Sequence, residues 1–199
     1  NKALEAKTQP NLAQGIKQIV ESPEMKGMIR QGIADQVKRS HAALFRRLGL
    51  TPEQEAAMTE LLVEQGVAGI QTGIHWLTGN QEQSSAEIVA AREKLYAEIG
   101  QRFGAQALTE YRYWDASKNE RESVARFNQG LGEEALDEAT SDRLVNMMYE
   151  TRGTFPDLEY LSQPENFNPR DLNPERQEEV MGQVTELHKR YVEEAAQVL

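Results

Sequence analysis

The sequence predicts an all-α protein: an extended assembly of long amphipathic helices with one arm rich in proline and aromatic residues. Three observations lead to this prediction. Apolar residues recur at intervals of three and four along most of the 199 residues. Helix-capping residues precede several of these stretches. No stretch combines alternating apolar and polar positions with the Val, Ile and aromatic residues typical of a strand. We expect one helical domain spanning residues 1–199.

Composition and charge exclude several classes of protein. The chain has 32 Asp and Glu against 22 Lys and Arg, a net charge of −10, which disfavours duplex nucleic acid and anionic membrane surfaces as partners. No apolar run reaches the ~20 residues that a membrane-spanning helix needs. The chain has no cysteine, which excludes disulfides and thiolate metal sites. We therefore expect no nucleic-acid partner and no membrane span.

The first helices follow from their start and stop signals. Residues 1–21 carry apolar residues at helical spacing and are expected to form an N-terminal helical arm. Ser22-Pro23-Glu24 is typical of a helix N-terminus, with an N-cap, a proline in the first turn and an acid that suits the helix dipole. The apolar face of the helix that follows is predicted to run from Met25 to Leu48, and Gly49 is expected to end it.

A capping box predicts where the next helix begins. Thr51 is the expected N-cap, Pro52 suits the first helical position, and Gln54 completes the box. Within this helix Gly69 and Gly73 lie four residues apart on one face. Their spacing leaves two interpretations open, which are the close approach of a second helix and a bend or hinge.

The remaining elements are predicted in the same way. A helix beyond the break at residues 78–80 is expected to end near Gly100 to Gly104, and another is expected from Ala105 to the glycines at 130 and 132. Thr140 or Ser141 is the expected cap of a short helix, and Asn173 is the expected cap of the last helix. Between them, residues 153–173 lose the helical pattern and gain prolines and aromatic residues, which predicts a long irregular connection lying across the helices.

The last helix has a narrow apolar seam that alternates mostly between steps of four and three, as coiled-coil helices do. Long apolar faces of this kind are difficult for one compact domain to cover on every side. A symmetric pair would bury the same face twice, so we expect a homodimer. The seam consists of Val180, Val184, Leu187, Tyr191 and Val198.

No motif predicts a catalytic or metal site. His41, His75 and His188 are far apart in the sequence, and none lies at a ligand spacing from another histidine. The adjacent pairs of glutamates point in different directions on a helix, so they are expected to be solvated surface. We expect no catalytic residue, no metal and no cofactor.

Aromatic residues are the candidates for protein interaction. Tyr111, Tyr113 and Trp114 lie close to several arginines, a combination that is common in interface hot spots. Packing in the core explains Trp114 equally well, and both interpretations stay open. The other candidates lie in the arm rich in proline, and they are Phe155, Tyr160 and Phe167.

One short motif resembles a known family. The residues Leu50-Thr51-Pro52-Glu53-Gln54 resemble the LTxxQ motif of the Spy- and CpxP-like periplasmic proteins. The sequence before the motif is similar to that of many exported bacterial proteins. The resemblance implies a helical, often dimeric periplasmic protein with a chaperone or envelope-stress role. Because the motif is also a capping box, Leu50, Thr51, Pro52 and Gln54 are equally explained as a helix cap.

These observations lead to one functional expectation and two alternatives. We expect an exported, non-enzymatic protein that binds other proteins in the bacterial envelope. The chain does not begin with Met, so we expect that a segment preceding Asn1 has been removed. The first alternative is a structural or oligomerisation module without clients, and the second is an enzyme of unknown type.

Overall fold

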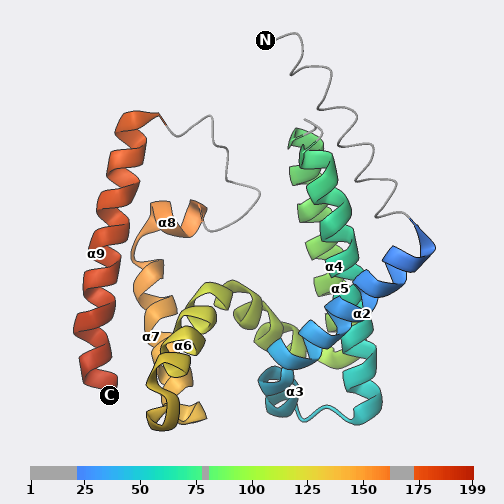
Figure 1. Ribbon diagram of the computed structural model, residues 1–199, viewed down its shortest axis with the longest axis horizontal. Helices are drawn as coiled ribbons and strands as arrows, with labels where there is room; N and C mark the ends of the chain where they lie inside the picture. The colour runs from blue at the N-terminus through green and yellow to red at the C-terminus, as the bar shows by residue number, and fades with distance from the viewer. Residues whose placement is uncertain (1–21, 78–80, 162–172) are drawn as a thin grey trace. The chain divides into compact units, whose positions relative to one another are not determined.

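A computed structural model describes residues 22–77, 81–161 and 173–199 (Figure 1). Helices account for 92% of these residues and strands for none, which confirms the all-α fold. No helix in the described ranges is long and apolar enough to cross a membrane. Contacts group the chain into two compact units, residues 1–112 and 113–199, which are described separately here. The single domain over 1–199 stays a prediction, and the predicted arm at 1–21 lies outside the described residues.

The first unit begins with α2 (Pro23–Ser40) and α3 (Ala42–Leu48). Ser22 caps α2 as predicted by accepting a hydrogen bond from the Met25 amide at 3.3 Å. The continuous helix expected from Met25 to Leu48 is wrong, because it breaks at His41. The Ser40 hydroxyl donates to the Gln36 carbonyl and lies 2.9 Å from His41 Nδ1. Such local side-chain bonds compete with the helix, and this accounts for the break.

The helix α4 (Pro52–Leu77) packs against α2. Arg30 of α2 forms an ion pair with Glu60 of α4. Next to this pair, a Cβ atom on Gly66 would lie 2.9 Å from Ile33 Cγ2, so Gly66 is where the two helices approach closely. A Cβ atom on Gly69 or Gly73 meets nothing within 4 Å among the described residues. The close approach therefore belongs to Gly66, and α4 runs without a break through both other glycines.

The helix α5 (Gln81–Ala116) contains the break that the glycines predict. Gly104 has φ 91° and ψ 171°, a conformation that favours glycine, and it divides α5 into two helical segments. A Cβ atom on Gly100 would lie 3.2 Å from Leu108 Cδ2, so the second segment passes close to the end of the first. The helix expected from Ala105 to the glycines at 130 and 132 ends at Ala116 instead, and α6 begins at Lys118.

The second unit contains the end of α5 and five further elements: α6 (Lys118–Leu131), the short 3-10 helix η1 (Gly132–Glu134), α7 (Glu138–Gly153), α8 (Pro156–Leu161) and α9 (Pro174–Val198). α9 lies alongside α7 and α8 (Figure 1). Val124, Leu144 and Val145 form the centre of a small apolar core between α6 and α7. Because α8 lies within 153–173, part of the expected irregular connection is helical, and residues 162–172 lie outside the described ranges.

Two caps of the second unit can be compared with the prediction. Asn173 caps α9 as expected, since its side chain accepts a hydrogen bond from the Arg176 amide at 2.8 Å. The cap of α7 is Asp137, which accepts from the Thr140 amide at 2.6 Å, so the expected cap at Thr140 or Ser141 is wrong. An aspartate at the N-cap offers the same hydrogen bond three positions earlier and adds a charge that suits the helix dipole.

The predicted seam of α9 packs against other helices of its own unit. Leu187 is buried, and Val198 packs against the core of Val124, Leu144 and Val145. Val180, Val184 and Tyr191 are half-buried on the same helix. The seam therefore has neighbours in its own unit, and the homodimer stays a prediction that needs another surface.

We predict opposite effects for two glycine-to-alanine changes in α4. Alanine is favoured over glycine in a helix interior by about 1 kcal/mol, so Gly69→Ala is expected to raise the free energy of unfolding by up to that amount. Gly66→Ala is expected to lower it by about 1–3 kcal/mol relative to Gly69→Ala, because the new methyl group would press on the stiff, β-branched Ile33. Urea denaturation followed by circular dichroism measures both. Equal stabilisation by the two changes would contradict the close approach at Gly66.

Candidate protein-binding surface

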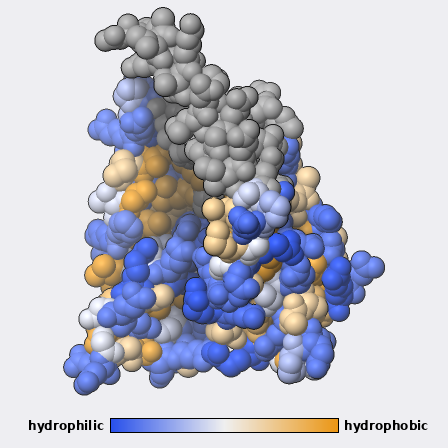
Figure 2. Space-filling view, turned by 45° about the vertical axis from the view of Figure 1, so that its right-hand side comes forward, coloured by the Kyte–Doolittle hydropathy of each residue, from blue (hydrophilic) through white to orange (hydrophobic). Residues whose placement is uncertain are grey.

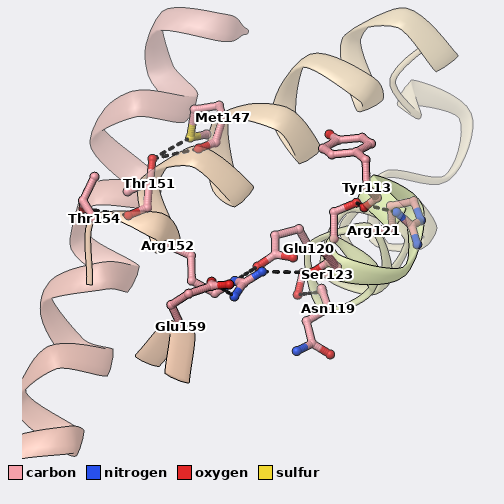
Figure 3. Close-up of polar contacts among 12 residues, drawn as sticks. Tyr113, Asn119, Glu120, Arg121, Ser123, Met147, Thr151, Arg152, Thr154 and Glu159 are labelled. Atoms are coloured by element: carbon pink, nitrogen blue, oxygen red, sulfur yellow. Dashed lines mark hydrogen bonds and ion pairs between the residues drawn. The ribbon is translucent and has the colours of Figure 1, made fainter. Parts of the chain in front are cut away.

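A buried ion pair holds the second unit together. Arg152, near the end of α7, donates from Nε to Glu120 Oε1 of α6 at 2.7 Å and from Nη2 to the Ala116 carbonyl at 2.9 Å (Figure 3). Its Nη1 donates to Glu159 of α8. The side chains of Arg152 and Glu120 are only 7% and 3% exposed. One planar guanidinium therefore connects α6, α7, α8 and the end of α5, using donors fixed in a fork.

A tyrosine of α9 lies within the electric field of this ion pair. Burial raises the pKa of Tyr191 well above its ordinary value, and the negative charges of Glu120 and Glu194 raise it further, while Arg152 opposes them. The phenol is thus neutral throughout the physiological range. Glu194 also accepts a hydrogen bond from the Thr151 hydroxyl of α7, which attaches the C-terminal half of α9.

A second polar contact attaches the N-terminal half of α9. Asp157, in the first turn of α8, accepts hydrogen bonds from Arg176 Nη2 at 2.7 Å and from Gln183 Nε2 at 2.8 Å. The hydrogen bond from Arg176 has the larger effect and that from Gln183 adds to it, and both hold the pKa of the Asp157 carboxyl below its ordinary value. Arg176 also pairs with Glu179 at 2.6 Å. Together with Thr151 and Glu194, these contacts fix the rotation of α9 about its own axis.

This rotation leaves a row of large apolar side chains in solvent. Met181, Val192 and Leu199 are 62%, 73% and 64% exposed. They are separated by 11 and 7 residues, close to whole numbers of helical turns, so they lie on one side of α9. Phe127 and Tyr160 are also exposed in this unit. Figure 2 shows one face of the protein, on which hydrophobic residues appear between predominantly hydrophilic ones.

The surrounding charge is strongly negative. Residues 113–199 hold 9 Lys or Arg against 19 Asp or Glu, a difference of −10, whereas residues 1–112 hold 13 of each. The whole net charge of the protein thus belongs to the second unit. α9 alone has six glutamates against three basic residues. An apolar row in acidic surroundings suits a partner that brings both apolar and basic side chains.

The structure places most of the predicted aromatic residues inside their own units. Tyr111 is buried and stacks on His41 with ring centroids 6.3 Å apart. Trp114 is buried beneath the guanidinium of Arg121, 3.8 Å from its ring. Tyr113 is half-buried and meets Tyr149 edge-on. These contacts within the chain account for the cluster of aromatic and arginine residues in the sequence.

The aromatic residues of the predicted arm have different surroundings. Phe155 is half-buried, with the guanidinium of Arg190 from α9 5.0 Å from its ring. Tyr160 is 57% exposed, so it is accessible to a partner. Phe167 lies outside the described residues.

The residues of the LTxxQ-like motif make a reciprocal helix cap. The Thr51 amide donates to Gln54 Oε1 at 2.9 Å, and the Gln54 amide donates to Thr51 Oγ1 at 3.3 Å. Pro52 is the first residue of α4, and Leu50 precedes it with its amide bonded to the Phe45 carbonyl. The four residues therefore have a structural role at the start of α4.

The exposed row on α9 was not predicted from the sequence. The signal was present, because residues 181, 192 and 199 follow a stripe one position away from the seam that was identified. The ion pair of Arg152 and Glu120 joins residues 32 apart in the sequence, and no local pattern indicates it.

We predict that removing one partner of the buried ion pair without the other strongly destabilises the second unit. Arg152→Met leaves the Glu120 carboxylate buried without its cation, which is expected to lower the free energy of unfolding by about 3–5 kcal/mol. Adding Glu120→Met to this variant removes the orphaned charge and is expected to recover much of the loss. Lys118→Met is the control, since Lys118 and Glu122 form an exposed pair at 3.9 Å and the loss should be below about 1 kcal/mol. Equal losses for Arg152→Met and Lys118→Met in denaturant unfolding would contradict this role.

We predict that acid weakens the attachment of α9 through protonation of Asp157. Its pKa is lower in the folded protein than the ordinary value of 3.8, so its contribution to stability is complete above that value and is lost as the pH falls through the folded pKa. The difference in unfolding free energy between the wild type and Asp157→Asn should thus be largest near neutral pH and shrink as the pH falls below about 4. Denaturant titrations at several pH values measure it, with Glu178→Gln as the exposed control. A difference that does not change with pH would show that the Asp157 charge is not involved.

Comparison of the chain with family models, with curated proteins and with solved structures finds no match. The resemblance to Spy- and CpxP-like proteins therefore depends on the residues from Leu50 to Gln54, which cap α4. The candidate binding surface is therefore the acidic second unit with its exposed apolar side chains.

Proposed function

We propose that this protein is a non-enzymatic protein-binding protein of the bacterial envelope with a chaperone-like role. One observation carries the protein-binding part of the proposal: the acidic second unit exposes large apolar side chains, three of them in a row along α9. Covering apolar side chains that are exposed to solvent lowers the free energy of the complex, so these side chains favour the binding of a partner. The negative surroundings favour partners whose apolar segments also carry Lys or Arg.

The residue types of the row suit a surface that accepts varied partners. Met181 is flexible and polarisable, and methionine is common on binding surfaces that adapt to different sequences. Tyr160 adds an amphipathic aromatic side chain in the same unit. Client segments that are unfolded, apolar and basic have the matching chemistry.

The envelope location rests on the LTxxQ-like motif alone. The resemblance of Leu50 to Gln54 supports export, because the proteins that it resembles are periplasmic. Osmotic-shock fractionation of the native host tests the location, and we expect the protein in the periplasmic fraction. Recovery with the cytoplasmic marker would contradict it, without bearing on whether the second unit binds proteins.

We predict that the protein slows the aggregation of basic unfolding clients. Light scattering of reduced lysozyme, which is basic, is expected to rise more slowly in its presence, and reduced α-lactalbumin, which is acidic, should be protected much less. A variant with Met181→Gln, Val192→Gln and Leu199→Gln removes the apolar row without changing the charge and should lose most of the protection. Met28→Gln is the matched control, because Met28 is 60% exposed in the first unit.

Two results would contradict the proposal. Protection that is equal for the triple variant and the wild type would show that the row on α9 is not the binding surface. No protection of either client, together with a dimer mass in light scattering, would favour the structural or oligomerisation module.

A further inference from the structure

The exposed row on α9 is part of a longer stripe with a coiled-coil period. Three further residues lie between its large apolar side chains and complete steps of 4, 3, 4, 3 and 4. Such an alternation of four and three is the spacing that keeps one seam facing a partner helix. The stripe consists of Met181, Thr185, His188, Val192, Ala195 and Leu199.

α9 therefore carries two apolar stripes side by side. Its own unit covers the inner one, and of the outer one only Ala195 packs against the small core. The inner stripe, which includes Leu187 and Val198, faces α7 and the small core. The outer stripe has large side chains at Met181, Val192 and Leu199, all more than 60% exposed. A helix with two adjacent stripes is suited to two helical neighbours, and α7 provides one of them.

The side chains of the outer stripe favour a helix over an extended segment. Thr185 is small and exposed and leaves room between the larger residues, so that a side chain of a facing helix can enter as a knob. His188 is exposed and, like Thr185 one step before it, places a polar group in the stripe. A polar residue in a seam of this kind sets the register of the partner.

Charge decides which helix can occupy the stripe. A second copy of this chain would bring another unit with a net charge of −10 against the first. Glu175 and Glu178 lie near the Met181 end of α9, and they form no ion pair with other described residues. Like charges in an interface disfavour the second copy, whereas Lys and Arg beside an apolar seam would be attracted.

We propose that the outer stripe of α9 binds a basic amphipathic α-helix of another protein. The partner contributes large apolar residues with a heptad period and Lys or Arg at the flanking positions. This inference rests on the proposed protein-binding function and gives it a more specific ligand, a helix instead of any unfolded basic segment.

A designed peptide tests the proposal. The probe has about three heptads, with Leu at the seam and Lys at the flanks, and carries a fluorophore for anisotropy measurements. We expect it to bind the full chain, and the helical signal of the mixture in circular dichroism to exceed the sum of the separate signals. Val192→Gln should weaken binding by roughly tenfold, because it removes a central apolar contact. Met28→Gln should leave binding unchanged.

Two comparison peptides separate shape from charge. A scrambled peptide of the same composition keeps the charge and loses the heptad, and equal binding of it would overturn the helical partner. A peptide with Glu in place of every Lys keeps the heptad, and equal binding of it would overturn the requirement for basic residues. Val192 is 73% exposed, so the Val192→Gln variant is expected to fold, and its unfolding curve verifies this.

The oligomeric state of the protein in the absence of peptide provides the last test. A wild-type dimer that becomes a monomer on Val192→Gln would show that a second copy occupies the stripe and would overturn the proposal. Failure of the peptide to bind, while reduced lysozyme is still protected, would reject the helical partner and leave the proposed function standing.

Discussion

Three helices of the second unit and the end of α5 meet at the guanidinium of Arg152, and α9 is attached to two of these helices, α7 and α8. The guanidinium reaches Glu120, Glu159 and the Ala116 carbonyl at once, and so connects three helices to the end of α5. Lysine could not replace it, because a single ammonium group cannot meet three acceptors in one plane. The contacts of α9 with Asp157 and Thr151 depend on α7 and α8 being held in this way, and the exposure of Met181 and Val192 depends in turn on those contacts.

The exposure of the outer stripe follows from the way in which α9 is attached. Polar contacts at Asp157 and Glu194 fix its rotation, and a modest apolar contact around Leu187 covers one of its stripes. A larger core would have covered both stripes. Because the core around Val124 is small, the large side chains of the second stripe stay in solvent.

The sequence predicted the helices better than their breaks or their contacts. Caps such as Ser22 and Asn173 are local signals, and the structure has them where they were expected. The break at His41 was missed because it coincides with a local bond from the Ser40 hydroxyl to the Gln36 carbonyl, and because apolar residues at helical spacing continue on both sides of it. The approach of α2 to Gly66 and the pairing of Arg152 with Glu120 join distant residues. Periodicity within one helix does not show which residues of another helix will lie opposite.

The uneven division of charge has a kinetic consequence. The first unit has no net charge and the second has all −10, so the electric field around the molecule is centred on one part of the chain. Such a field accelerates the diffusional encounter with a positively charged molecule and turns it toward the acidic unit before any contact is made. Added salt screens the field over about 8–10 Å, and it would slow association more than dissociation. For the proposed basic partner, the rate of association would thus depend on the glutamates and the rate of dissociation on the apolar row.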